Sequence, residues 1–347
     1  MLAAVYHGIG DLRVEEIPEP QFGEDEALLK VRVAAICGTD RRILKYGHFK
    51  IPEGTGRVLG HELAGEIAAV GSRVKGLTPG VKVTIAPNIG CGICEQCVQG
   101  HNHLCPNYEA LGISLDGGFS EYMRIPAAAI RQGNIIEIPE GVSYEEAALN
   151  EPLSCCYNGF LACGIKPGDV VFIVGAGPIG IMHLLLAKLG GASKVIVSQR
   201  SDPRRTLAAQ FGADVVVNPT EEDLSAIIRN ETQGRGVDVV IIAALAAKAQ
   251  EEALDWAAVG GRINLFGGLP KGQETVNFDA NKVHYKQLTI TGTTGSSSYQ
   301  FRRTMDIIAS RRVELSRLVT ARFPLKDALK AFDTADARQG LKVVIVP

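Results

Sequence analysis

The 347-residue sequence carries almost no excess charge of either sign and contains no long apolar run. Lys and Arg number 36 against 38 Asp and Glu, which gives a formal net charge of −2. This balance argues against nucleic acid or an anionic membrane as a partner. No apolar run reaches the roughly 18 residues that a membrane-spanning helix needs. Residues 1–20 lack a basic segment followed by an apolar one, so no secretory signal is expected.

Low-complexity segments and internal repeats are also missing from the sequence. The chain is long enough for two domains, each with its own core. It contains eight cysteines, and without a secretion signal these indicate metal or thiol chemistry rather than disulfides. We therefore expect a cytoplasmic globular protein.

A glycine-rich turn follows an apolar strand in the second half of the chain. Residues 170–174 form an apolar, β-branched run that is typical of a strand covered on both faces. The turn is a G-x-G-x-x-G that contains Gly175, Gly177, Pro178, Ile179 and Gly180. A periodic apolar helix follows it, and a second strand over 194–198 completes a βαβ unit. In this context the pattern predicts a dinucleotide phosphate site, although a purely structural turn is the alternative.

The end of the second strand bears on which dinucleotide binds. NAD sites usually place an acidic residue there for the ribose 2′-OH, whereas here the neutral Gln199 is followed by Arg200, and Asp202 comes late. Arg200 together with Arg204 could pair with a 2′-phosphate. We therefore favour NADP(H) over NAD(H); the alternative is that these arginines begin a solvated helix.

Strands and helices alternate regularly from residue 169 onward. Strands are expected near 170–174, 194–198, 214–217, 237–242, 261–266 and 287–291, with helices between them that include 221–229 and 247–259. Six such strands predict a doubly wound parallel sheet, and hence an α/β fold. Helices over 301–310 and 326–335 and a strand over 341–346 are expected to follow.

The first 90 residues are β-rich and contain two short clusters with chemically active side chains. Strand-like runs cover 27–35, 65–70 and 81–86. The clusters contain Cys37 with Thr39, and His61 with Glu62. Cys, His and Glu are zinc ligands, and three protein ligands with an open position are typical of a catalytic zinc site. Alternatively, Cys37 is a small buried hydrophobic residue and His61 a hydrogen-bonded core residue.

Four further cysteines lie within fifteen residues. Their spacing is C-x2-C-x2-C-x7-C, formed by Cys91, Cys94, Cys97 and Cys105. Four thiolates suit a closed structural zinc site, although the spacing alone does not exclude an iron–sulfur cluster. His101 and His103 are interpreted as bystanders.

A change of domain is expected near residue 152. Ser143 and Glu146 form a capping box that begins a short helix. The segment 150–153 is expected to end that helix, and 154–163 to form another. Glu151 either points into a cleft between domains or caps a helix.

Taken together, these motifs resemble the zinc-dependent medium-chain dehydrogenase/reductase family over essentially the whole chain. The motifs are Cys37-Gly38-Thr39-Asp40, Gly60-His61-Glu62, the four cysteines, Asn150-Glu151-Pro152-Leu153 and Gly175–Gly180. Glu151-Pro152 is similar to the polyol (sorbitol) and threonine dehydrogenase branch.

The resemblance implies a GroES-like catalytic domain over 1–152, with the cysteine lobe at 91–105, a Rossmann domain over 153–292, and a return to the catalytic domain over 293–347. It implies two zinc ions, one structural and one catalytic. Cys37 and His61 would be fixed ligands of the catalytic ion, with Glu62 and Glu151 exchanging as direct ligand and water-mediated neighbour. Thr39 would relay the substrate proton. Gly292, Thr293 and Thr294 would lie beside the nicotinamide, and the protein would be a homodimer or homotetramer.

The expected activity is hydride transfer between NADP(H), or less favourably NAD(H), and a secondary alcohol or ketone. The substrate is expected to be a polyol, sugar alcohol or sugar-alcohol phosphate. The alternatives are an NAD-dependent L-threonine or other amino- or short-chain-alcohol dehydrogenase, and a non-catalytic zinc-binding interaction protein. The last is disfavoured because 83–123 contains no Lys or Arg.

One departure from the family pattern concerns the proton relay. Relatives often have His where this chain has Arg42, so the relay would end at the cofactor ribose, at water or at His48. Basic residues gather in this segment, namely Arg41, Arg42, Lys45, His48 and Lys50. They form either a solvated loop or a site for an anionic group of the substrate.

Overall fold

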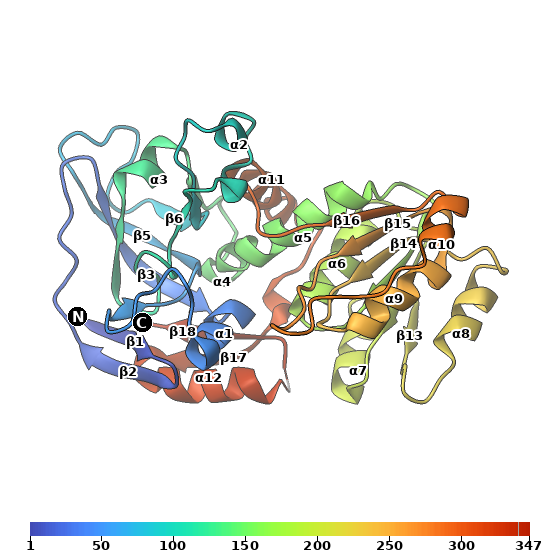
Figure 1. Ribbon diagram of the computed structural model, residues 1–347. Helices are drawn as coiled ribbons and strands as arrows, with labels where there is room; N and C mark the ends of the chain where they lie inside the picture. The colour runs from blue at the N-terminus through green and yellow to red at the C-terminus, as the bar shows by residue number, and fades with distance from the viewer. Residues whose placement is uncertain (339) are drawn as a thin grey trace. The chain divides into compact units, whose positions relative to one another are not determined.

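A computed structural model describes residues 1–338 and 340–347 (Figure 1). The chain forms two compact units. Unit 1 contains Met1–Ser154 and Gly295–Pro347, and unit 2 contains Cys155–Thr294. Both ends of the chain therefore build unit 1. The chain passes from unit 1 to unit 2, and back again, two residues later than the sequence predicts. Close to these two boundaries, the hydroxyl oxygens of Ser154 and Ser296, both in unit 1, lie 2.6 Å apart.

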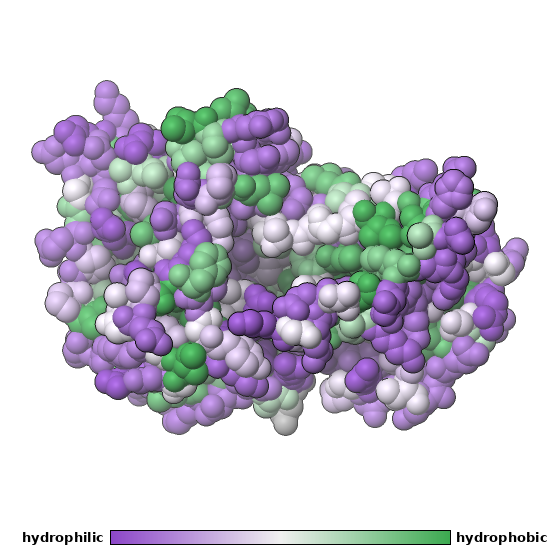
Figure 2. Space-filling view, in the orientation of Figure 1, coloured by the Kyte–Doolittle hydropathy of each residue, from purple (hydrophilic) through white to green (hydrophobic). Residues whose placement is uncertain are grey.

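The surface is mainly hydrophilic on the face that Figure 2 shows. Among the described residues, no helix combines the length and the apolar character needed to cross a membrane. Apolar residues gather over the short helix α2 (Glu95–Val98) (Figure 2), where Ile93 and Val98 are 86% and 75% exposed. Because α2 buries none of its residues, this part of unit 1 has little hydrophobic core of its own.

Unit 2 contains a parallel sheet with the strand order β13-β12-β11-β14-β15-β16. Its strands are β11 (Val170–Val174), β12 (Lys194–Ser198), β13 (Val215–Val217), β14 (Val237–Ile242), β15 (Ala257–Leu265) and β16 (Thr289–Gly292). Its helices are α6 (Pro178–Leu189), α7 (Asp202–Gln210), α8 (Leu224–Glu231), α9 (Ala247–Trp256) and α10 (Ala280–Tyr285). The strand order reverses beside β11, which confirms the doubly wound α/β sheet and puts the glycine-rich turn at the switch point.

The core of unit 2 follows from its β-branched strands. All but the last residue of β11 are buried, as expected for a strand covered on both faces. Phe172 and Trp256 meet edge to face, with ring centroids 5.1 Å apart. The helix expected over 247–259 was predicted too long: α9 ends at Trp256 because Ala257 already pairs with Val237 in the sheet.

Unit 1 is built around a larger, mainly antiparallel sheet with the order β10-β6-β5-β3-β18-β17, in which β9 also pairs with β3. Its strands are β3 (Ala27–Ala35), β5 (Glu62–Val70), β6 (Lys82–Ile85), β9 (Tyr122–Ile125), β10 (Ile135–Glu137), β17 (Val319–Pro324) and β18 (Lys342–Val346). A smaller sheet joins β2 (Asp11–Glu16), β1 (Leu2–Gly8) and β4 (Arg57–Val58), and β7 (Asn88–Ile89) pairs with β8 (Glu109–Ala110). The helices are α1 (Gly38–Tyr46), α3 (Ala127–Arg131), α4 (Tyr144–Ala148), α11 (Ser298–Ala309) and α12 (Ala328–Ala337), besides α2.

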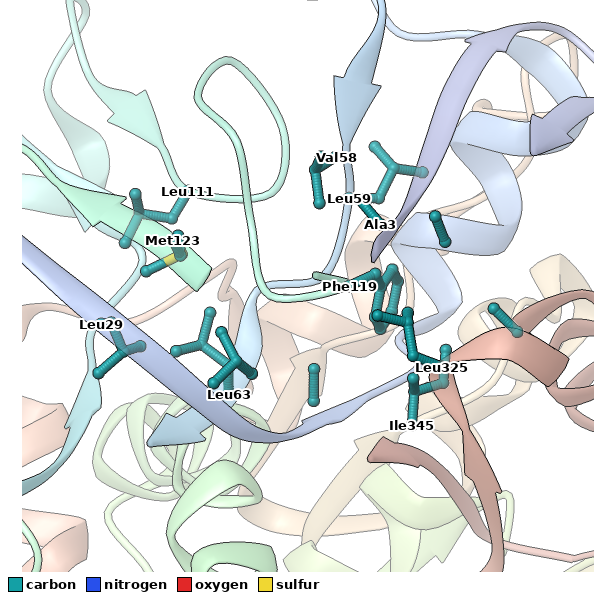
Figure 3. Close-up of a cluster of buried hydrophobic side chains, with 14 of the residues drawn as sticks. Ala3, Leu29, Val58, Leu59, Leu63, Leu111, Phe119, Met123, Leu325 and Ile345 are labelled. Atoms are coloured by element: carbon teal, nitrogen blue, oxygen red, sulfur yellow. The ribbon is translucent and has the colours of Figure 1, made fainter. Parts of the chain in front are cut away.

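Residues from both ends of the chain share the core of unit 1. Figure 3 shows Phe119 beside Leu59 and Leu325, with Ile345 close to Leu325. Phe119 is fully buried and meets Phe332 edge to face at 5.6 Å. The C-terminal strand β18 is therefore an integral part of this unit.

The segment 150–153 begins a helix rather than ending one. The Ser143–Glu146 capping box starts α4 as expected. The next helix, α5, runs from Asn150 to Cys163, so the break expected at 150–153 was wrong. Pro152 lies in the first turn, where a backbone N–H has no intrahelical partner, so proline is tolerated. The side chain of Asn150 donates to the carbonyl oxygen of Phe301 at 2.8 Å and fixes the helix start.

We predict that Gly180→Ala destabilises unit 2 by about 1–3 kcal/mol, as over-packing does in well-packed sites. A Cβ at Gly180 would lie 1.8 Å from the carbonyl oxygen of Gly175. Gly268→Ala is the matched control, because a Cβ there meets nothing within 4 Å. Denaturant unfolding of both variants checks this, and equal free energies of unfolding would contradict the close helix–strand approach.

Candidate active site

Strand register brings three chain segments together at one edge of the large sheet. In the β3–β5 pair Ala35 lies opposite Glu62, and in the β18–β3 pair Val344 lies opposite Ala35. Cys37 follows the end of β3, His61 precedes β5, and Lys342 begins β18. Their side chains thus start from neighbouring points although they are far apart in the sequence.

Cys37, His61 and Glu62 offer ligand atoms that all lie within 4.8 Å of one another. His61 is 6% exposed and Glu62 is fully buried, while Cys37 is half-buried. A sulfur, an imidazole and a carboxylate gathered at a buried position form a donor set that suits zinc. The donor set therefore fits the ion that the family resemblance implies.

Asp40 is a site residue that the sequence analysis did not assign a role. It lies in the first turn of α1, where its Oδ2 accepts from the backbone N–H of Cys37 at 2.8 Å. Its other oxygen, Oδ1, lies 3.4 Å from His61 Nδ1. Asp40 is fully buried, so it can fix the orientation of the ring and leave Nε2 for a metal. Burial disfavours the charged ring, but Asp40 and Cys37 outweigh it and raise the pKa of His61.

Glu62 has a second buried partner, Lys342. The ammonium group of Lys342 contacts both carboxylate oxygens of Glu62. Lys342 is only 4% exposed. Burial lowers its pKa, but the charges of Glu62, Cys37 and Glu151 outweigh burial, so the net shift is upward. The sequence analysis treated residue 342 only as part of a strand; a lysine among apolar strand residues was the available signal.

The two other expected residues of this site lie nearby on helices. Glu151 lies in the first turn of α5 and is 7% exposed. It does not belong to the three-residue group within 4.8 Å, although its charge acts on Lys342. Thr39 lies in the first turn of α1 and is half-buried.

The four cysteines of the lobe converge as a second group. The sulfurs of Cys91, Cys94, Cys97 and Cys105 lie within 4.8 Å of one another. The backbone N–H of Cys91 donates to Cys105 Sγ at 3.3 Å, and that of Cys94 donates to Cys91 Sγ at 3.4 Å. Hydrogen bonds from the backbone of Ile93 and Cys94 lower the pKa of Cys91 to about 6. Four sulfurs leave no open position, which suits a structural metal.

The lobe is attached to the rest of unit 1 by buried amides. Asn102 donates to the carbonyl oxygen of Asn88 at 2.6 Å and accepts from the backbone N–H of Ser298 at 3.0 Å. His101 and His103 stand outside the four-cysteine group, with ring centroids 6.3 Å apart. Burial lowers the pKa of His103 to about 4.

In unit 2 the glycine-rich turn leads from β11 into α6. Gly175 has φ +102°, a conformation that favours glycine, and its N–H donates to the carbonyl oxygen of Ser198 at 2.8 Å. Gly177 is the N-cap of α6, Pro178 is its first residue, and Ile179 follows. Arg204 Nη1 lies 3.7 Å from the position that a Cβ atom would occupy if Gly177 carried a side chain. The guanidinium group of Arg204 therefore lies close to the glycine-rich turn.

The residues after the C-terminal end of β12 are hydrogen-bonded by Arg205, which is not one of the two arginines, Arg200 and Arg204, that the sequence analysis selected. Arg205 donates to the carbonyl oxygens of Gln199 and Arg200, at 3.0 and 2.6 Å. The Gln199 side chain accepts from the N–H of Ser201 at 3.3 Å, and the Arg200 side chain is exposed. Arg204, rather than Arg200, therefore approaches the glycine-rich turn.

The expected nicotinamide segment lies at the end of β16. Gly292 is the last residue of that strand, and the Thr293 hydroxyl donates to Asn264 Oδ1 on β15 at 3.2 Å. Asn264 is fully buried, while Thr294 is exposed. The hydrogen bond fixes the end of β16 to its neighbour.

Two family models match the chain. The model for "Alcohol dehydrogenase GroES-like domain" matches residues 23–139, in unit 1. The model for "Zinc-binding dehydrogenase" matches residues 178–310, mostly in unit 2.

Similar proteins cover nearly the whole chain. The L-threonine 3-dehydrogenase of Pyrococcus horikoshii is 37% identical over 338 residues, which cover 95% of this chain and 94% of that protein. The structure of a putative zinc-binding dehydrogenase from Sinorhizobium meliloti bound to NADP is 35% identical, with a TM-score of 0.91 and coverage of 100% and 99%. The alcohol dehydrogenase RspB from Escherichia coli, complexed with NADH, is 28% identical with a TM-score of 0.91 and the same coverage.

We predict that the two cysteine-containing groups respond differently to substitution. Cys37→Ser or His61→Ala should leave one zinc ion per chain and lower kcat/KM by at least about 100-fold, while the protein stays folded. Cys94→Ser should remove the other zinc ion and mainly lower Tm, because a structural site contributes folding free energy. Metal analysis and thermal unfolding of each variant check this. Near-normal turnover in Cys37→Ser would contradict the assignment.

Proposed function

Because the chain belongs to the zinc-dependent medium-chain dehydrogenase family, we propose that it oxidises the secondary alcohol carbon of a small polar substrate with a nicotinamide cofactor. The family members are oxidoreductases of the alcohol dehydrogenase type. The observation that carries the proposal is the convergence of Cys37, His61 and Glu62 within 4.8 Å at a buried position. The same three ligand types recur in catalytic zinc sites.

L-Threonine is the first substrate to test, ahead of the polyols expected from the sequence. Curated relatives that are 33–37% identical, from Pyrococcus and Bacillus species among others, are named L-threonine 3-dehydrogenase. L-Threonine has a secondary hydroxyl group with an ammonium and a carboxylate group close by. This chemistry matches the amino-alcohol alternative of the sequence analysis.

In the proposed mechanism, Cys37 and His61 would hold a zinc ion, which when bound would supply Lewis-acid polarisation of the substrate oxygen. Asp40 keeps the His61 ring in the orientation that ligation needs. The Thr39 hydroxyl would accept the proton that leaves the substrate oxygen and pass its own proton on to the cofactor ribose, to water or to His48. A bound nicotinamide cofactor would supply the acceptor for the hydride of the substrate carbon, so that the alcohol would become a ketone.

The basic segment after Cys37 favours an anionic group on the substrate. Within the described part of the chain, no carboxylate forms an ion pair with Arg42 or Lys50, whereas Arg41 pairs with Asp336. Burial, followed by the charges of Lys50 and Arg42, lowers the pKa of His48. Lys50 Nζ lies 4.0 Å from the ring centroid of Tyr108, which holds it in place. A substrate carboxylate, or the phosphate of a sugar-alcohol phosphate as the second candidate, would balance this charge.

Arg204 supports NADP(H) as the cofactor. Its guanidinium group lies close to Gly177, and the residue that follows β12, Gln199, is uncharged. A 2′-phosphate near these residues would meet a cation rather than a carboxylate. Of the two solved structures compared above, which share this fold, one holds NADP and the other holds NADH.

We predict that a substrate panel identifies L-threonine as a better substrate than uncharged alcohols. Its kcat/KM should exceed that of 2,3-butanediol and sorbitol by at least about tenfold, the value of one charge-assisted hydrogen bond. Arg42→Ala should raise KM for L-threonine and leave KM for butanediol unchanged. Higher kcat/KM with a sugar-alcohol phosphate would favour the second candidate, and no turnover with any secondary alcohol would contradict the function.

For the cofactor, we predict that Arg204→Leu lowers kcat/KM for NADP by at least about tenfold and leaves that for NAD nearly unchanged. The control is Arg229→Leu, at an exposed arginine on α8 of the same unit. Steady-state kinetics with each cofactor check this. A parallel loss with both cofactors would mean that Arg204 only supports the fold.

A further inference from the structure

We propose that His183, a buried histidine of α6, is a positioning residue for the expected nicotinamide segment, and that its ring N–H donates to the Thr293 hydroxyl when a nicotinamide cofactor binds. The inference rests on the proposed function in one respect, namely that unit 2 binds such a cofactor. It adds a role for a side chain that the sequence analysis did not select.

The ring of His183 lies where several segments of unit 2 meet. His183 follows Ile179, an expected cofactor residue, by four positions, so both lie on the same face of α6. Its ring meets that of Phe266, the residue after β15, edge to face with centroids 4.6 Å apart. A Cβ atom on Gly159 of α5 would lie 2.9 Å from His183 Cε1 and 3.4 Å from Thr293 Oγ1. His183 and Thr293 therefore border the same small space beside Gly159.

Both ring nitrogens of His183 are buried and have no hydrogen-bond partner within the described part of the chain. The residue is 1% exposed, and its neighbours on α6, Met182 and Leu184, are buried apolar residues. Burial lowers the pKa of His183 to about 3, so the neutral ring carries one N–H and one acceptor nitrogen. An unpaired buried donor is costly, and native proteins keep few of them. A partner that joins the ring in another state of the protein accounts for this cost.

A chain of hydrogen bonds beside the ring lacks a first donor. The Thr293 hydroxyl donates to Asn264 Oδ1 at 3.2 Å, and the Asn264 amide donates to Thr291 Oγ1 at 3.1 Å. The Thr291 hydroxyl in turn donates to the carbonyl oxygen of Ile263 at 3.2 Å. Among the described residues no group donates to the Thr293 hydroxyl, which can still accept. A free N–H and a free acceptor oxygen thus border the same space.

The exposed position of the segment after β16 explains why a cofactor would join the two groups. Thr293 is half-buried, whereas its neighbours Gly292 and Thr294 are exposed. With a nicotinamide ring resting on this segment, Thr293 moves toward the interior of unit 2, where His183 lies. The new N–H···O bond then extends the hydrogen-bonded chain and fixes the segment. Cofactor affinity increases because the N–H of His183 is satisfied only in the complex.

The first test measures two properties of the full chain, namely the Tm without cofactor and the Kd of NADPH and of NADH. His183→Leu removes both unpaired nitrogens, so the Tm of the cofactor-free chain should rise by about 2–4 °C. The same substitution removes the donor to Thr293, so the Kd of the tighter-binding cofactor should rise by about tenfold. A lower Tm with an unchanged Kd would mean that His183 only fills space, and would overturn the proposal.

Three further variants serve as controls for the hydrogen bond. His183→Gln keeps a donor and an acceptor, so its Kd should stay close to that of the unaltered chain. Met182→Leu is a volume-conserving change at a buried residue of the same helix and should leave both properties unchanged. Thr293→Val removes the acceptor and should raise the Kd as His183→Leu does. Combining His183→Leu with Thr293→Val should raise it no further, because both remove the same interaction.

NMR of the histidine rings, labelled with nitrogen-15, reports the hydrogen bond itself. The chain has seven histidines, and the signal of His183 is identified by its loss in His183→Gln. Adding the tighter-binding cofactor should move the ring N–H proton of His183 downfield. In Thr293→Val the same addition should leave this proton unmoved.

The outcomes separate this inference from the proposed function. If neither cofactor binds the unaltered chain, both are overturned. If a cofactor binds and both His183→Leu and Thr293→Val weaken it, but no secondary alcohol is oxidised, only the proposed function is overturned. An unchanged Kd in His183→Leu, or an unmoved N–H proton in the unaltered chain, overturns only the role of His183. If His183→Leu does not fold, Thr293→Val and the NMR measurement decide.

Discussion

The register of β3 against β5 and β18 is the constraint on which the candidate site depends. It brings Cys37, His61 and Lys342 to one edge of the sheet from three distant parts of the chain. Because side chains alternate between the two faces of a strand, a slip of one residue would move these groups to opposite faces. The core around Phe119 stabilises this register from residues at both ends of the chain. Packing and chemistry in unit 1 are therefore linked.

Local patterns were sufficient to predict much of the fold. The strand–turn–helix at 170–189 was predictable because glycine spacing and apolar periodicity act over a few residues. The four-cysteine group was predictable for the same reason. The end of α9 and the start of α5 were not. Pairing of Ala257 in the sheet ended one helix early, and Asn150, held by Phe301, began the other. Both effects come from residues distant in sequence.

The residues that the sequence analysis missed act through other residues. Asp40 was quoted in a motif, but its contact with His61 depends on the fold. Lys342 lies 280 residues from Glu62. A lysine among apolar strand residues is a signal at position 342, but it does not identify Glu62 as the partner. Arg204 was predicted as a cofactor residue, yet the structure distinguishes it from Arg200 through its position over Gly177. Ligand types are thus visible in the sequence, whereas their supporting partners require three-dimensional structure.

X-ray absorption at the zinc edge of the pure, zinc-loaded protein tests most directly whether Cys37 and His61 hold a second metal ion. The account predicts two zinc ions per chain that share five thiolates. The average shell per zinc would then hold about 2.5 sulfurs near 2.3 Å and about 1.5 nitrogens or oxygens near 2.0–2.1 Å. One zinc ion per chain with about four sulfurs and no lighter ligand would contradict the account.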